Sequence, residues 1–503
     1  MSIRTNDPQA REMLSEILSP EPAMESRPFD ARAVVTRCRL DIVLKYLFFR
    51  SLSGTADRAH WEFFYRKHIL HRTNGIEPRD RFQKTESNKR SVDDYVLACE
   101  ELLRSFKSNG FDPTYPVPVS ADNKLLNGAH RIACALATEH KVFVKPSERG
   151  VSRSWGFQWF LKRGYPRDVL AALLYQYARL TRRAIGVLIL WGPAMEAWSE
   201  VLASLKDQVG VVGWLDLSFE TNPSAFESIL YDIYSLQWQD LEQSNIRRKA
   251  ILLNQSRRTF RMVLVEDLFN DQRVFFKKLR QQRDTLRGNL DKIIPEEAFC
   301  TCHASSKQKE ASYLVELLLG QGSRKHQRLR GRGQLRPEFG TWLFKLADAL
   351  SRYGLSRHDV CIVGSSPLEV VGVRNATDID ITVASRFRKR FGPGITHLEE
   401  WLDIVTAGYA RSADRPRISD DELIDDPQHH FWFRGFKFAD IDIVLRRKAW
   451  QGRAKDIADV EAANKLLSPA AVKKVQSIGT NAAGLDLISY LVRRERESEA
   501  GRL

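Results

Sequence analysis

The sequence predicts a mixed α/β fold made of several domains, and three observations lead to this prediction. The chain has 503 residues, more than one hydrophobic core usually serves. Hydrophobic residues make up 43% and charged residues 28% of it, which is ordinary for a globular protein and argues against a disordered, fibrous or membrane-embedded chain. Segments with the spacing of strands and of helices follow one another along much of the sequence.

The division into domains follows changes in composition and pattern. We expect a helical N-terminal extension (1–90), a small α+β domain (91–150), an α/β middle domain (151–320), a basic linker (321–337) and a C-terminal domain with a mixed sheet and helices (338–503). Glycine and arginine alternate without apolar periodicity in the linker, as in an exposed connection. A phosphate-binding arm is the functional alternative for this segment.

The elements of the first three domains are predicted from apolar spacing. In the small domain the pattern predicts a helix over Ser91–Phe106, an extended run at Tyr115–Val119, a turn at Gly128 that opens a helix ending near Leu136, and a strand at His140–Val144. In the middle domain it predicts strands at Ile185–Trp191, Val211–Leu217 and Phe299–His303 and helices at Met195–Leu205 and Glu310–Leu319.

Charge and the absence of export signals narrow the class of protein. The net charge of +15 would attract polyanions or phosphorylated substrates, although dispersed surface charge is an equal alternative. The N-terminus lacks the apolar core of a signal peptide, and the longest apolar run is too short to span a bilayer. We therefore expect a cytoplasmic protein without a membrane span.

The six cysteines show no paired framework, as expected of reduced thiols. Zinc binding at Cys300, Cys302 and His303 is disfavoured, because alternate thiols on a strand point to opposite faces and no second pair completes a tetrahedral site. His303, at the end of its strand, is instead a weak candidate for phosphate binding.

The C-terminal domain contains the clearest candidate site. A helix over Phe339–Tyr353 is followed by a strand at Asp359–Val363 that ends in Gly364-Ser365-Ser366. Glycine lets the backbone approach a phosphate closely, while amides and two hydroxyls can bond its oxygens. The sequence therefore predicts a triphosphate-binding turn at these three residues.

Two aspartates follow on the next predicted strand, Thr377–Thr382. The strand period of two places Asp378 and Asp380 on one face. Neighbouring carboxylates repel each other unless a cation neutralises them, and hard oxygen ligands suit Mg²⁺. We therefore predict that both aspartates bind Mg²⁺ or Mn²⁺.

A third carboxylate is expected on a later predicted strand, Phe436–Leu445. Asp440 and Asp442 alternate there on one face, and Asp442 is the preferred ligand, with Asp440 as its rival. Three carboxylates could hold a pair of ions, one activating an attacking hydroxyl and the other stabilising the leaving pyrophosphate.

This order of a strand ending in Gly-Ser, an Asp-x-Asp strand and a later strand aspartate resembles the DNA polymerase β-like nucleotidyltransferase superfamily. The resemblance covers about the last third of the chain. It implies a nucleotidyltransferase-like mixed sheet, metal ligation by Asp378, Asp380 and Asp442, and a nucleoside triphosphate as substrate. The later Arg453-Ala-Lys455-Asp456 segment is similar to a helix of small nucleotidyltransferases, which implies nucleotide contacts for Lys455; a charge-paired helix surface is the alternative.

The segment from Pro116 to Leu136 resembles the ParB/sulfiredoxin-like fold, in which an extended strand and a Gly-x-x-Arg turn open a helix. The resemblance implies phosphate or nucleotide binding by Asn127, Gly128, His130 and Arg131. Physically, Gly128 permits the turn, the helix N-terminus offers amides, and Arg131 can bind phosphate through two hydrogen bonds. Many relatives carry an acidic residue in place of Asn127.

The main functional hypothesis is a Mg²⁺-dependent nucleotidyltransferase that moves a nucleoside monophosphate to an unidentified acceptor. A first alternative is an ATP- or ADP-dependent small-molecule kinase centred on the N-terminal domain, or a bifunctional enzyme of surface-glycan biosynthesis. A second alternative is a non-catalytic nucleic-acid-binding or regulatory protein, whose binding would weaken steeply with salt.

Overall fold

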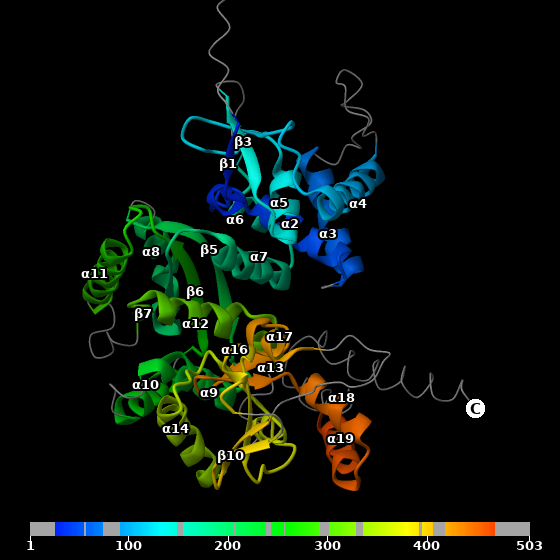
Figure 1. Ribbon diagram of the computed structural model, residues 1–503. Coiled ribbons are helices and arrows are strands. Elements are labelled where there is room, and N and C mark those ends of the chain that lie inside the picture. The colour runs from blue at the N-terminus through cyan, green and yellow to red at the C-terminus, as the bar shows by residue number, and fades with distance from the viewer. Residues whose placement is uncertain are drawn as a thin grey trace, which may run out of the picture. The chain divides into compact units, whose positions relative to one another are not determined.

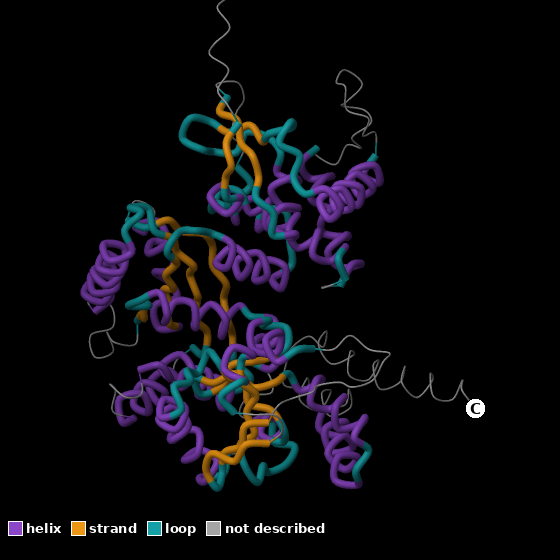
Figure 2. The backbone as a smooth tube through the Cα atoms, in the orientation of Figure 1, coloured by secondary structure: helices purple, strands orange, loops and turns teal. Residues whose placement is uncertain are grey.

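The structure is a computed structural model in which two compact units are distinguished (Figures 1 and 2). Unit 1 comprises Met1–Pro166 and Arg179–Arg182, and unit 2 comprises Arg167–Ala178 and Arg183–Leu503. Both units contain helices and strands, which confirms the mixed α and β class. The structure describes residues 26–54, 57–73, 91–147, 154–205, 208–237, 243–255, 257–291, 301–327, 335–391, 395–405 and 418–467. Over these ranges, none of the helices has the length and apolar character needed to cross a membrane.

Unit 1 is built on a small sheet with strand order β1-β3-β2. Its strands are β1 (Arg27–Phe29), β2 (Val117–Val119) and β3 (Val142–Pro146), with β3 antiparallel to β1 and parallel to β2. Its helices are η1 (Ala31–Val34), α2 (Leu40–Leu52), α3 (Arg58–Arg72), α4 (Val92–Asn109), α5 (Ala129–Thr138) and α6 (Phe157–Leu161). The elements predicted between 91 and 146 are therefore confirmed in type and order.

Helices α2 and α3, from the predicted N-terminal extension, fall in the same compact unit as the small sheet. Helix α2 packs against both α3 and α5. Helix α4 begins with a capping box, in which the Ser91 side chain accepts from the Asp94 amide (3.1 Å) and the Asp94 side chain accepts from the Ser91 amide (2.8 Å).

A charged cluster lies inside unit 1. Asp41 on α2 is fully buried and binds Arg39 Nε at 2.8 Å and Lys45 Nζ at 2.7 Å, and Lys45 also contacts His68 Nε2 at 3.4 Å. Burial alone would raise the pKa of Asp41, but the charges of Lys45 and Arg39 outweigh it and hold the pKa below its usual value. Burial lowers the pKa of Lys45 to about 8, against the attraction of Asp41. The cluster is compensated internally, as a buried charge requires.

The first sheet of unit 2 is antiparallel, with strand order β5-β6-β4-β7. Its strands are β4 (Ile185–Trp191), β5 (Gly210–Ser218), β6 (Thr259–Glu266) and β7 (Cys302–Ala304). The helices around it are α7 (Arg167–Leu180), η3 (Gly192–Ala197), α8 (Trp198–Leu205), α9 (Pro223–Tyr234), η4 (Ser235–Gln237), α10 (Gln243–Gln255), α11 (Gln272–Asp291) and α12 (Gln308–Leu319). Side chains of α8 and α11 share one core with β4, β6 and β7. The alternation of strand and helix predicted for the middle domain is confirmed.

The second sheet of unit 2 is mixed and has strand order β10-β11-β9-β8-β13-β12. Its strands are β8 (Val360–Val363), β9 (Ile379–Val383), β10 (Ile395–Glu399), β11 (Leu402–Val405), β12 (His430–Phe433) and β13 (Phe436–Ala439). Its helices are α14 (Pro337–Arg352), α15 (Ser366–Val370), α16 (Ser385–Arg388), α17 (Asp420–Asp425), α18 (Ile441–Gln451) and α19 (Ala454–Leu467). Strand β9 runs antiparallel to β8 and parallel to β11, whereas β8 and β13 are parallel. The mixed sheet predicted for residues 338–503 is thus present.

The start of the predicted basic linker is a folded element. Residues 321–326 form helix α13 (Gln321–His326), which packs against β12 and has Ser323 and His326 buried. Ser323 Oγ accepts from the Trp432 amide at 3.1 Å, and Glu316 accepts from Trp432 Nε1 at 2.8 Å. These contacts join the two sheets of unit 2. Residues 328–334 lie outside the described part of the chain.

The predicted strand at 436–445 is wrong in its second half. Strand β13 ends at Ala439, and Asp440 caps helix α18 by accepting from the Asp442 amide at 2.9 Å. The pattern is ambiguous because the apolar residues that alternate as on a strand also place Ile441, Val444 and Leu445 at helical spacing.

Candidate metal centre

The turn after β8 brings backbone and carboxylate into direct contact. Gly364 adopts a left-handed conformation (φ +67°), and a Cβ built on it would overlap Oδ2 of Asp380 and lie 3.0 Å from its Cγ. Only glycine fits this position without displacing Asp380. The predicted small-residue turn therefore positions the Asp-x-Asp strand as well as ending β8.

The two serines of the turn have different environments. Ser366 is buried at the start of α15, and its hydroxyl donates to the Asp378 carbonyl at 3.0 Å. Ser365 remains partly exposed. Of the two predicted phosphate-binding hydroxyls, that of Ser366 thus fixes the backbone at Asp378, and that of Ser365 is the more accessible.

The loop that leads to Asp378 is held by a buried carboxylate. Glu369 on α15 accepts from the Ala376 amide at 2.6 Å and forms two hydrogen bonds with the Arg336 guanidinium at 3.1 and 3.0 Å. Such two-point Arg–carboxylate contacts fix direction as well as distance. The entry to β9 is therefore fixed from both sides, by Ser366 and by Glu369.

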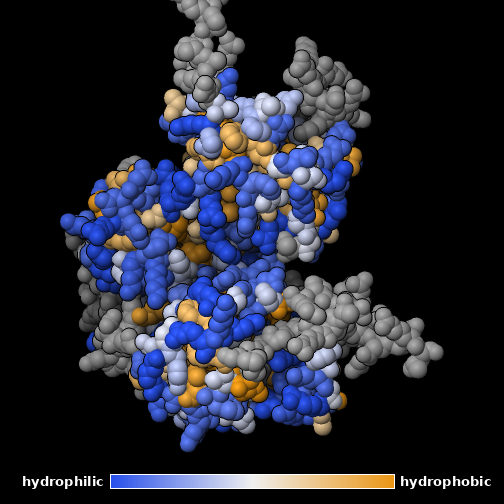
Figure 3. Space-filling view, in the orientation of Figure 1, coloured by the Kyte–Doolittle hydropathy of each residue, from blue (hydrophilic) through white to orange (hydrophobic). Residues whose placement is uncertain are grey.

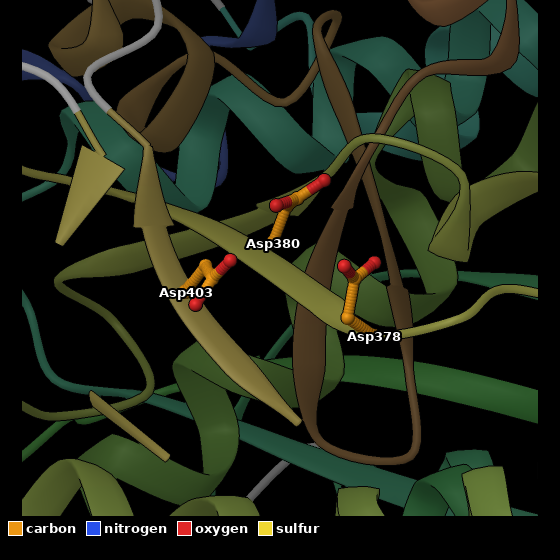
Figure 4. A group of neighbouring side chains, drawn as sticks. All are labelled: Asp378, Asp380 and Asp403. Carbon is orange, nitrogen blue, oxygen red and sulfur yellow. The ribbon is translucent and has the colours of Figure 1, made fainter. Parts of the chain in front are cut away.

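Three aspartates converge at this end of the sheet (Figure 4). Asp380 on β9 lies opposite Asp403 on the parallel strand β11, and Asp378 immediately precedes β9. One carboxylate oxygen from each of Asp378, Asp380 and Asp403 lies within 4.8 Å of the others. We call these three residues the acidic triad.

The triad raises the pKa of its central member. Burial of Asp380 is the largest cause, and the negative charges of Asp378 and Asp403 add to it, so that the pKa rises to about 6. The positive charges of Arg447 and Lys448 on α18 act in the opposite direction. Asp403 also contacts a residue outside the triad: His397 Nδ1 on β10 lies 2.7 Å from Asp403 Oδ1.

The donor set fits a hard divalent cation. All three side chains offer carboxylate oxygens, the ligands that Mg²⁺ and Mn²⁺ prefer. A cation between them would remove the repulsion that raises the pKa of Asp380.

Asp442 does not join Asp378 and Asp380. It lies in the first turn of α18, where Lys325 of α13 binds both Asp442 and Asp440, the latter at 3.1 Å. His326 Nε2 contacts the other oxygen of Asp440 at 3.0 Å. Asp442 and Asp440, the two candidates for the third metal ligand, therefore form a separate buried ion cluster with Lys325 and His326.

Asp403 was missed by sequence reasoning, although a signal for it exists. Leu402-Asp403-Ile404-Val405 alternates like the Asp-x-Asp strand and lies much closer in sequence to Asp380 than Asp442 does. Asp403 lies beside Asp380 because β11 pairs with β9, and this pairing cannot be predicted from the local pattern.

The helix predicted around Arg453 is present as α19, and its charges bind one another. Asp456 contacts Arg453 Nε at 2.5 Å and Lys448 Nζ at 3.0 Å. Asp459 contacts Lys448 at 2.7 Å and Arg374, in the loop before β9, at 3.1 Å. Lys455 is exposed on α19. Lys448 of α18, which the sequence did not single out, is the lysine whose charge reaches Asp380.

The predicted N-terminal site forms the expected turn and helix. Gly128 has φ +86° and precedes α5, and Asn127 Oδ1 accepts from its amide at 2.7 Å. Arg131 donates to the carbonyls of Tyr115 and Pro116, the latter at 3.3 Å, and burial lowers its pKa. His130 Nε2 contacts the Tyr65 hydroxyl at 2.9 Å. The side chains of Arg131 and His130 thus join parts of unit 1.

His303 likewise has a contact within the fold. Its Nε2 lies 3.1 Å from Glu310, which also accepts from the Ser306 amide at 2.7 Å. Cys302 is a buried free thiol, and Cys300 lies outside the described residues.

Comparison with known proteins found no protein family whose model matches the chain, no similar curated protein and no solved structure with a significant likeness.

Proposed function

We propose that the second sheet of unit 2 carries a Mg²⁺- or Mn²⁺-dependent nucleotidyltransferase, which moves a nucleoside monophosphate from a nucleoside triphosphate to an acceptor hydroxyl. The observation that carries this proposal is the acidic triad beside the Gly364 turn. Carboxylates at this spacing next to a glycine turn suit a metal-bound triphosphate. The strand-ending Gly-Ser and the Asp-x-Asp strand, which carry the resemblance to polymerase β-like nucleotidyltransferases, point the same way, with Asp403 in place of Asp442 as the third carboxylate.

In this proposal Asp378, Asp380 and Asp403 hold the ion, which when bound orients the triphosphate and offsets charge on the leaving pyrophosphate. The acceptor hydroxyl attacks the α-phosphorus, a new P–O bond forms, and the bond to pyrophosphate breaks. The hydroxyl proton passes to a carboxylate of the triad.

Other residues near the triad would contact the triphosphate or hold the metal ligands in place. Gly364 and Ser365 line the turn against which the triphosphate lies, and Ser366 keeps Asp378 in place through its carbonyl. The positive charges of Arg447 and Lys448 on α18 favour the ionised form of Asp380, which is the form that binds a cation.

The kinase alternative centred on unit 1 has weaker support from the described residues. Arg131, its expected phosphate ligand, donates to two backbone carbonyls, and Asn127 accepts from a neighbouring amide. A phosphate would have to displace these contacts to be bound.

The proposal is tested by calorimetric titration of the four nucleoside triphosphates, with and without Mg²⁺. Wild type is compared with Asp378→Asn/Asp380→Asn, with Asp403→Asn, and with Asp442→Asn as the matched control outside the triad. We expect Mg²⁺-dependent binding that is lost in the double variant, weakened at least about tenfold in Asp403→Asn and retained in Asp442→Asn. Binding that survives unchanged in the double variant would remove the proposed site.

A further inference from the structure

Helix α18 combines basic and aromatic side chains beside the acidic triad. Arg446 and Trp450 are exposed one helical turn apart, and Arg447 is partly exposed between them. Trp450 is 64% exposed, although tryptophan is normally among the more buried residues. We call Arg446, Arg447 and Trp450 the α18 face.

The α18 face is attached to the candidate site through several contacts. Helix α18 packs against α15, the helix that begins at the Gly364 turn. Its Lys448 binds Asp459, which in turn binds Arg374 in the loop before β9. Helices α18 and α19 lie side by side (Figure 1). An extended ligand that ends at the triad can therefore continue along α18.

The charge of this region favours a polyanion. The one acidic residue of α18 is Asp442, which is buried against Lys325, so the charged side chains on the exposed part of the helix are those of Arg446 and Arg447. Arg453, at the turn after α18, is also exposed and is paired with Asp456. The surface of α18 and α19 that faces the viewer in Figure 3 is mostly hydrophilic, which argues against an apolar protein or membrane contact.

We infer that the α18 face binds the acceptor of the proposed reaction and that this acceptor is a single-stranded nucleic acid, with a base stacked on Trp450 and phosphates on Arg446 and Arg447. An exposed aromatic ring on the same helix as two guanidinium groups suits this ligand, because bases stack on aromatic rings and arginine binds backbone phosphate.

This inference rests on the proposed function in one respect, that the nucleic acid is the acceptor of the reaction. Its binding to the α18 face can be measured without catalysis. Fluorescence anisotropy is recorded with labelled single-stranded RNA and DNA of about 12 nucleotides, and with the RNA duplex, in EDTA. We expect the single strands to bind more tightly than the duplex. Trp450→Ala should weaken single-strand binding about tenfold, whereas Trp450→Phe should retain most of it.

Three further measurements distinguish stacking on Trp450 from a loss of binding that any exposed aromatic substitution would cause. Phe344 on α14 is also exposed (54%), and Phe344→Ala should leave binding unchanged. Arg446→Ala should weaken binding and reduce its dependence on salt concentration. Nucleoside triphosphate binding with Mg²⁺ should be unaffected by Trp450→Ala.

The outcomes distinguish the inference from the proposed function. Single-strand binding that depends on Trp450, without any Mg²⁺-nucleotide binding, would support nucleic-acid binding by the α18 face and contradict the proposed reaction. Loss of nucleotide binding but not of RNA or DNA binding in Trp450→Ala would assign the ring to the nucleotide and overturn the inference. Absence of single-strand binding at low salt, or binding equal in Trp450→Ala and wild type, would also overturn it.

Discussion

Gly364 and Asp380 are in contact across the β8–β9 pair. The carboxylate of Asp380 lies against the backbone of Gly364, where a side chain would otherwise be. The relationship makes the turn a part of the metal centre. Any side chain at Gly364 must move the central carboxylate of the triad.

Gly364→Ala should therefore reduce Mg²⁺ affinity at least about tenfold and lower the stability of the second sheet. The matched control is Gly452→Ala, because Gly452 has a similar left-handed φ (+63°) but open space around a Cβ. That control should cost about 1 kcal/mol of stability and leave metal binding unchanged. Calorimetric Mg²⁺ titration and urea unfolding give both quantities. Equal metal affinity in the two variants would contradict the assigned contact.

The binding of metal should depend on pH through Asp380. Because the pKa of Asp380 is about 6, protons compete with the metal below that pH, and affinity should increase between about pH 5 and pH 7. Calorimetry over this range measures the effect, and Asp380→Asn removes it. A flat profile in the wild type would show that Asp380 is not a ligand.

The same raised pKa predicts how the stability of the metal-free protein changes. A carboxyl group with a higher pKa in the folded state contributes stability below its unfolded pKa, near 3.8, and this contribution is lost as the pH rises through about 6. Mg²⁺ should restore the lost stability above pH 6, since a bound cation favours the ionised form. Urea unfolding with and without Mg²⁺ checks this sign.

The buried charges of unit 1 should be sensitive to the loss of one partner. Asp41→Asn leaves Lys45 and Arg39 buried without their carboxylate and should cost about 3–5 kcal/mol. Asp93→Asn is the control, because Asp93 also pairs with an arginine but its side chain is 72% exposed. It should change stability little. Hydrogen exchange of the α2 amides reports on unit 1 alone, and similar protection in both variants would contradict the prediction.

The local parts of the site could be predicted from the sequence, whereas its long-range parts could not. The turn at Gly364 and the shared face of Asp378 and Asp380 follow from a strand-ending glycine and a period of two. Asp403 depends on which strand pairs with β9, and Asp442 depends on whether a short apolar run becomes strand or helix.

The N-terminal motif shows the same difference between local and long-range information. The turn at Gly128 and the helix after it were predictable from a glycine before a helical pattern. The environment of Arg131 was not, because its contacts are backbone carbonyls of Tyr115 and Pro116, which are supplied by the fold of the preceding segment.

Helix α13 has a practical consequence for dissecting the protein. Its Lys325 and His326 compensate Asp440 and Asp442 at the start of α18. A fragment that began at α14 would contain the whole second sheet but would leave two buried carboxylates without Lys325 and His326, their partners on α13. The shortest expression fragment worth testing for the C-terminal site therefore begins before α13, and gene truncation at the apparent basic linker would yield an unstable product.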